Sequence, residues 1–109
     1  MFEIYTTSNF DRELKKLSKK YPSIISDFKV LLKTFEDQPF QDSPLGRDCY
    51  KIRMAVSSKN RGKSGGSRII TCVKIINNSI TLLLIYDKSD QNNISDKVLV
   101  SLLEENNLK

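Results

Sequence analysis

The sequence predicts an α+β fold in which an antiparallel sheet packs against helices, with the element order β-α-α-β-β-β-α. Three observations lead to this prediction. Two neighbouring segments near the N-terminus carry apolar residues at helical spacing, the second half carries three segments typical of strands, and the last segment returns to helical spacing. The whole chain, residues 1–109, is expected to form one domain with an N-terminal helical hairpin and a C-terminal helix.

The N-terminal third contains the predicted first strand and both helices of the hairpin. Residues 2–6 alternate and are β-prone, which is typical of a strand. Ser8 is a candidate N-cap for a helix over about 9–20, and a second apolar stripe predicts a helix over about 23–36. Pro22 separates the two, because proline ends one helix and suits the first turn of the next.

Three strands are predicted in the second half of the chain. Residues 38–48 contain two prolines and a glycine and indicate a loop. Strands are then expected at 49–57, 67–76 and 79–86, with a basic loop over 58–66. The middle strand is apolar on both faces, which is typical of a central position in a sheet.

A polar loop and a final helix complete the prediction. Asn93 is the candidate N-cap of that helix, since its side chain can accept the first free backbone N–H groups. Ile94, Val98, Leu102 and Leu103 follow at helical spacing and are expected to face the sheet.

Charge and composition narrow the classes of function. The formal net charge of +5 and a pI near 9.3 favour a polyanionic partner, and nucleic acid is a better candidate than a membrane surface. A protein whose surface is basic but binds no polyanion would have the same net charge. The chain has no histidine, which excludes histidine acid–base catalysis and histidine-ligated zinc. The longest apolar runs, such as Leu82–Tyr86, are too short to span a bilayer, and no export signal is visible, so a cytoplasmic protein is expected.

Neither a cofactor nor a metal is expected. Gly62-Lys63-Ser64 is similar to the end of a phosphate-binding loop, but Ser57 stands where that motif requires its first glycine. The carboxylates have no spacing typical of metal ligands. Cys49 and Cys72 are expected to be free thiols, because disulfides are rare in chains that are not exported.

A basic cluster is the most informative pattern in the sequence. Lys51 and Arg53 fall on one face of the strand at 49–57, and apolar residues fall on the other. Arg68 begins the next strand, and Tyr86 ends the strand after it. Cations that could contact a nucleic-acid backbone surround this group: Lys59, Arg61, Lys63 and Lys88. Three adjacent strands can therefore bring these side chains to one patch.

Without histidine or metal, cleavage of RNA needs a base for the 2′-hydroxyl, cations for the phosphate and an acid for the leaving 5′-oxygen. Lys51 is the candidate base, because neighbouring cations disfavour protonation of its amine. Arg53 and Arg68 are the candidate phosphate ligands, and Tyr86 is a candidate for base stacking or proton transfer. The alternative from the same residues is a face that only binds an acidic partner or stays solvated.

These motifs resemble one known family. The segments Tyr50–Ala55, Lys59–Ile70 and Leu83–Ser89, together with Phe10–Leu17, are similar in order and content to toxins of the RelE/ParE superfamily from type II toxin–antitoxin systems. The resemblance is greatest to the HigB/RelE-like branch and covers nearly the whole chain. It implies an α+β fold like that of microbial ribonucleases.

The resemblance also implies a function. Toxins of the RelE type are metal-independent endoribonucleases (mRNA interferases) that cut mRNA in the ribosomal A site, and a cognate antitoxin protein neutralises them. Their basic catalytic residues correspond to Lys51, Arg53 and Arg68 in this chain. Their tyrosine near the start of the last helix is absent, because Ile94–Ser95 stands there, and Tyr86 is the candidate replacement. The ParE members share the fold but poison DNA gyrase, and a module that binds RNA or antitoxin without catalysis is the third possibility.

Overall fold

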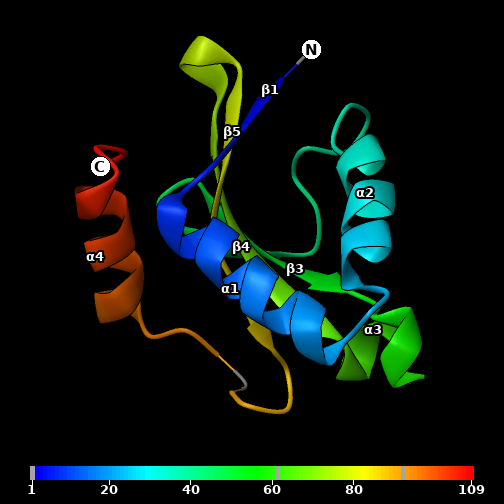
Figure 1. Ribbon diagram of the computed structural model, residues 1–109. Coiled ribbons are helices and arrows are strands. Elements are labelled where there is room, and N and C mark those ends of the chain that lie inside the picture. Colours follow the sequence, from blue (N-terminus) through cyan, green and yellow to red (C-terminus); the bar gives the residue numbers. More distant parts are fainter. Residues whose placement is uncertain (1, 61, 92) are drawn as a thin grey trace.

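The computed structural model describes residues 2–60, 62–91 and 93–109, and the predicted α+β fold class is confirmed (Figure 1). Five strands form one sheet in the order β1-β5-β4-β3-β2. The strands are β1 (Glu3–Thr6), β2 (Ser43–Gly46), β3 (Cys49–Met54), β4 (Ser67–Lys74) and β5 (Ser79–Asp87). The helices are α1 (Ser8–Lys20), α2 (Ile24–Thr34), α3 (Gly62–Gly65) and α4 (Asp96–Glu105), with short 3₁₀ turns η1 (Ser57–Lys59) and η2 (Ile75–Asn77).

The sheet is mixed, whereas the sequence predicted an antiparallel one. Strands β2 to β5 pair antiparallel, but β1 lies parallel to β5 at the edge of the sheet, with Glu3 opposite Ser79 and Thr6 opposite Leu82. The alternation of residues in β1 shows only that a strand is present. Its partner is more than seventy residues away along the chain, so no local pattern gives the direction of pairing.

Strand β2 lies in the segment that was predicted to be a loop. It joins β3 through a two-residue hairpin at Arg47 and Asp48, and both residues have positive φ, at 54° and 64°. Such turns favour Asn-Gly, so Arg-Asp gives little sequence signal. Salt bridges hold the turn from outside, with 3.3 Å between Arg47 and Asp96 and 2.9 Å between Asp48 and Lys74.

The helix caps differ from those predicted by one or two residues. The N-cap of α1 is Thr7 rather than Ser8, and its Oγ1 accepts a hydrogen bond from the Phe10 backbone N–H at 3.0 Å. The N-cap of α4 is Ser95 rather than Asn93, and its Oγ accepts one from the Val98 N–H at 3.2 Å. Because Ser95 caps the helix, the Asn93 side chain is available for a hydrogen bond with Lys51.

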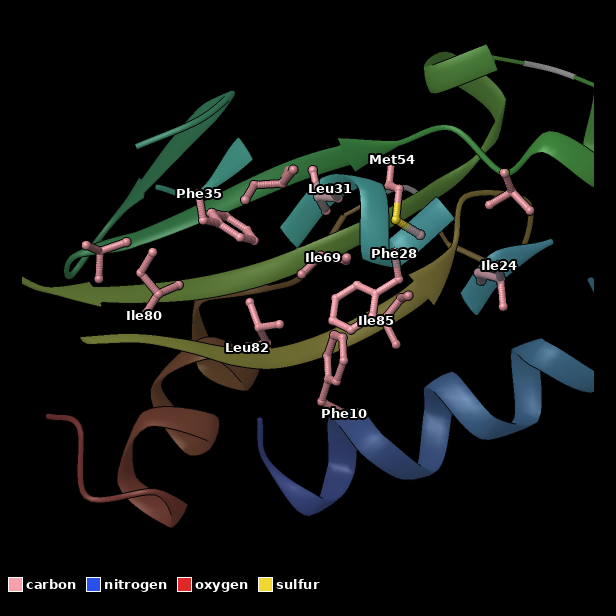
Figure 2. Close-up of a cluster of buried hydrophobic side chains, with 13 residues drawn as sticks. Phe10, Ile24, Phe28, Leu31, Phe35, Met54, Ile69, Ile80, Leu82 and Ile85 are labelled. Carbon is pink, nitrogen blue, oxygen red and sulfur yellow. The ribbon is translucent and has the colours of Figure 1, made fainter. Parts of the chain in front are cut away.

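Helices cover both faces of the sheet. On one face α1 and α2 bury a core that contains Phe10 and Phe28, whose ring centroids are 5.3 Å apart, against Ile69, Leu82 and Ile85 (Figure 2). On the other face lies α4 (Figure 1), and it covers a second cluster that includes its own leucines. The buried members of this second cluster are Cys49, Ile70, Cys72, Leu83, Tyr86, Leu99, Leu102 and Leu103.

Gly66 permits the close approach that connects α3 to β4. A Cβ atom at this position would lie 2.1 Å from the backbone oxygen of Met54 and 3.1 Å from the Cα of Ala55. Both are backbone atoms, so no side chain can turn away to make room. The return of the chain from α3 into β4 therefore requires glycine at position 66.

We expect Gly66→Ala to lower the free energy of unfolding by about 3 kcal/mol, because β3 and the α3–β4 connection must separate. The control is Gly46→Ala, at φ +82° with open space around it, which should lower it by only about 1 kcal/mol of backbone strain. Urea unfolding followed by circular dichroism gives both values. Equal losses in the two variants would contradict the steric argument.

Candidate active site

The register of the sheet places three of the predicted site residues in one row. Arg53 on β3 lies opposite Arg68 on β4, and Arg68 lies opposite Tyr86 on β5. Lys51 precedes Arg53 by two residues and therefore points to the same side of β3. Because the neighbouring Ile70 and Tyr86 belong to the cluster beneath α4, this is the α4 face of the sheet. The four residues predicted to be catalytic are thus brought together on one face.

Arg53 is the exposed member of the row, and Asp42 holds it in place. The pairing of β2 with β3 ends at Ser43 opposite Lys51, two residues before Arg53. Beyond this point the Asp42 carboxylate replaces the strand partner. Its Oδ2 accepts a hydrogen bond from the Arg53 backbone N–H at 2.7 Å, and its Oδ1 lies 3.6 Å from the Arg53 Nη2. The side chain of Arg53 remains about half exposed, so its guanidinium can still reach a phosphate.

Lys51 is held by the connection between β5 and α4. Its Nζ donates a hydrogen bond to Oδ1 of Asn93 at 2.8 Å. The partner is a neutral amide, so it orients the amine without placing a carboxylate beside it. The sequence indicated Asn93 only as a candidate cap of α4. The contact joins residues 42 positions apart, so no local pattern could predict it.

Arg68 and Tyr86 are buried, which the strand pattern did not indicate. Arg68 is only 5% exposed, and its Nη1 donates to the backbone oxygens of Lys63 at 2.9 Å and of Ser67 at 3.2 Å. Tyr86 is 6% exposed. Burial raises the pKa of the Tyr86 phenol and the charge of Arg68 lowers it, with a net increase, so the phenol is protonated at neutral pH.

The cations predicted to bind RNA differ in their exposure to solvent. Lys63 is exposed on α3, and it lines a surface groove between α2 and β3 together with Arg53 and Ala55. Lys88 is half-buried just beyond the end of β5. Arg61 lies outside the described residues.

Lys59 lies inside the fold rather than on its surface. Its Nζ is 2.6 Å from Oδ1 of Asp87 and 3.0 Å from Oγ of Ser89, and it lies over the ring of Tyr21 at 5.1 Å. The side chains of Lys59 and Asp87 are 7% and 1% exposed. This buried pair connects the 3₁₀ turn η1 to the end of β5, which is a structural role that a position in a basic loop did not reveal.

Asp87 is kept ionised by its donors. Burial by itself would raise the pKa of this carboxyl, but hydrogen bonds from Lys59, Tyr21 and Ser89 outweigh burial and hold its pKa well below the usual range. The negative charge then balances the buried ammonium of Lys59. Tyr21, the C-cap residue of α1, supplies one of these donors from a helix that is distant in sequence from β5.

Neither a metal site nor a membrane-spanning helix is present in the part of the chain that the structure describes. No group of three or more cysteine or carboxylate side chains there could hold a metal ion. Among the same residues, no helix is long and apolar enough to cross a membrane.

Comparison with known proteins identifies the family. The model of the family described as "RelE toxin of RelE / RelB toxin-antitoxin system" matches residues 2–105. The chain belongs to this family. No curated protein matches it. Membership of the RelE family makes the chain a toxin-antitoxin toxin and implies an antitoxin as its partner.

Solved structures show the same fold. One is a double arginine-to-alanine mutant of the E. coli toxin RelE in the free state, with a TM-score of 0.61 and 16% identity over 95% of this chain and 96% of that chain. Another is the isolated E. coli RelE toxin, with a TM-score of 0.57 and 16% identity over 96% of this chain and 99% of that chain. At this level of identity the likeness concerns the fold alone.

We expect Asp87→Asn to lower the free energy of unfolding by about 3 to 5 kcal/mol, because it leaves the Lys59 ammonium buried without a counter-charge. The control is Asp96→Asn, which removes the exposed partner of Arg47 and should change stability by about 1 kcal/mol at most. Chemical denaturation at neutral pH measures both. A loss no larger in Asp87→Asn than in the control would contradict the structural role.

The same pair predicts a dependence on pH. The pKa of Asp87 is lower in the folded than in the unfolded chain, so its contribution is complete above the unfolded value, near pH 4, and is lost as the pH falls toward the folded value. From about pH 5 to pH 2 the wild type should therefore lose more stability than Asp87→Asn. Parallel acid unfolding curves for the two proteins would contradict this.

Proposed function

We propose that this RelE-family toxin is a ribosome-dependent endoribonuclease that cleaves mRNA without a metal ion and so stops translation. The observation that carries the proposal is the row of Arg53, Arg68 and Tyr86 across three strands, with Lys51 beside it on the same face. One base, two guanidinium groups and one protonated phenol are the groups that cleavage of RNA through its own 2′-hydroxyl requires.

Each residue has a defined step in the proposed reaction. Lys51, as the free amine, takes the proton of the 2′-hydroxyl, and the 2′-oxygen attacks the adjacent phosphorus. Arg53 and Arg68 stabilise the charge that builds on the phosphate oxygens. The P–O5′ bond breaks to leave a cyclic 2′,3′-phosphate, and the phenol of Tyr86 gives its proton to the 5′-oxygen. The proton on Lys51 and the missing proton on Tyr86 then exchange with water, which restores the site.

The burial of Arg68 adds a requirement to this reaction. Its Nη1 is bonded to the Lys63 and Ser67 carbonyls, so a phosphate that binds this nitrogen must displace at least one of them. A charged phosphate oxygen is a stronger acceptor than a carbonyl, which favours the exchange once RNA is present. Lys63 and Arg53 line the adjoining groove, where the RNA backbone next to the cleaved bond would lie. The buried Lys59 is not part of this contact.

The antitoxin is proposed to neutralise the toxin by covering the same cations. Arg53 and Lys63 are exposed, so a partner that masks them must supply carboxylates. An acidic, partly extended segment fits this requirement, because it can follow the groove beside β3 and exclude RNA from it.

The proposed function predicts that inducible expression in bacteria arrests growth and creates new mRNA 5′ ends phased with the ribosome. Arg53→Ala and Lys51→Ala should each reduce cutting by about 100-fold or more, because each removes a group that acts on the reacting phosphate or hydroxyl. The matched control is Lys15→Ala, which removes an exposed cation from α1 and should leave cutting unchanged. Sequencing of mRNA 5′ ends measures all three.

Other outcomes would overturn this proposal in recognisable ways. Growth arrest with intact mRNA and DNA damage, retained in Lys51→Ala, would indicate a gyrase poison. A lack of arrest from well-folded protein would indicate a module that binds RNA or antitoxin without catalysis.

The contact between Lys51 and Asn93 allows a sharper test of the general base. In Asn93→Asp a carboxylate replaces the neutral acceptor and favours the protonated amine, so the limb of the pH–rate profile that reports this base should move up by about one pH unit. At neutral pH the cleavage rate should therefore fall about tenfold and recover at alkaline pH.

Asn93→Ala is the control, since it removes the acceptor without adding a charge and should leave this limb of the pH–rate profile in place. Single-turnover cleavage of ribosome-bound mRNA measures the profile, and an unmoved limb in Asn93→Asp would contradict the role of Lys51.

A further inference from the structure

The two cysteines of the chain face each other across the β3–β4 pair. Cys49 is the direct partner of Cys72 in the register. The backbone N–H of Val73 donates to the backbone oxygen of Asp48 at 2.9 Å, so Asp48 and Val73 form a hydrogen-bonded pair. Hydrogen-bonded and non-hydrogen-bonded pairs alternate along an antiparallel ladder, so the adjacent Cys49–Cys72 pair is non-hydrogen-bonded. Opposite residues of such pairs have Cα atoms about 4.5 Å apart, within the range that a disulfide spans. Both residues are free thiols in the structure.

The surroundings make the two sulfurs unequal. The interaction between the two thiols raises the pKa of Cys49 and lowers that of Cys72, and the Cys49 Sγ also contacts the Arg47 backbone oxygen at 3.4 Å. Burial raises the pKa of both thiols, and the nearby charge of Lys74 opposes it. Cys72 is thus the better nucleophile of the pair, because the thiolate is the reactive form.

Access to the pair is controlled by α4. Both cysteines are buried, and the apolar residues around them include Leu99, Leu102 and Leu103 of this helix. This helix lies beside the sheet, near the C-terminal end of the chain (Figure 1). We expect a small uncharged oxidant to reach the sulfurs through local opening of α4.

We propose that Cys49 and Cys72 form a redox site that hydrogen peroxide converts into a cross-strand disulfide within one chain. The Cys72 thiolate attacks one peroxide oxygen and the O–O bond breaks, which gives a sulfenic acid and, with one proton, water. The Cys49 sulfur then attacks the Cys72 sulfur, the S–O bond breaks, and a second water leaves. Two thiols are oxidised and one peroxide is reduced, so atoms and electrons balance.

The disulfide would close a loop from residue 49 to residue 72 that contains Lys51, Arg53 and Arg68. Cross-linking restricts the unfolded chain, so the oxidised protein should be the more stable form. The midpoint of thermal unfolding is expected to rise by about 10 °C on oxidation and to return when a thiol reductant is added. This inference does not depend on what the toxin cleaves.

The test treats the purified, reduced protein with hydrogen peroxide and measures its intact mass under non-reducing conditions. We expect a monomer lighter by about 2 Da, the mass of two hydrogens, which thiol reagents label only after reduction. A native monomer of unchanged mass would overturn the proposal. So would disulfide-linked dimers, or a gain of oxygen without loss of hydrogen.

Single substitutions test the order of attack. Cys49→Ala removes the resolving thiol, so Cys72 should stop at the sulfenic acid, about 16 Da heavier, and react with dimedone. Cys72→Ala removes the nucleophile, so Cys49 should stay unmodified under the same treatment. The reverse pattern would overturn the assignment of Cys72 as the attacking thiol. The wild-type mass measurement still decides the disulfide if either variant fails to fold.

Discussion

The pairing register of β3, β4 and β5 is the constraint on which the rest of this structure depends. Side chains alternate between the two faces of a strand, so a slip of one residue in β3 would move Lys51 and Arg53 into the α1–α2 core and Ile52 and Met54 under α4. Such a slip would remove apolar side chains from the α1–α2 core and bury cations there in their place. Burial of an unpaired charge in a dry core costs far more free energy than the native arrangement. Burial of the apolar face thus fixes the position of the cations on the other face.

A second layer of contacts holds the segment between β3 and β4 over Arg68. The buried pair of Lys59 and Asp87 ties the start of this segment to the end of β5, and Gly66 lets its end pass against Met54. Between these two points α3 presents the carbonyl of Lys63 to Arg68. The guanidinium therefore has a fixed direction before any substrate arrives, which reduces the entropy lost on binding.

Features that follow from the periodicity of side chains could be predicted from the sequence. Features that follow from contacts between residues distant in the chain could not. Alternation in one strand was enough to group Lys51 with Arg53, and strand order brought Arg68 and Tyr86 to them. The hairpin through Arg47 and Asp48 escaped detection because salt bridges, rather than turn-forming residues, stabilise it. In the same way, a lysine in a polar loop gives no indication that its partner is an aspartate 28 positions away, as for Lys59.

The parallel pairing of β1 with β5 affects how the toxin is made. Strand β1 leaves the translating ribosome before the other four strands of the sheet, but its partner β5 is the last of them, and α1 also packs on β5. Neither can dock until residue 87 or so has emerged, since contacts between distant parts of a chain form only when both parts are present. The row of site residues is completed by that same strand. The ribosome that synthesises this chain is therefore exposed to the finished fold only after β5 has emerged.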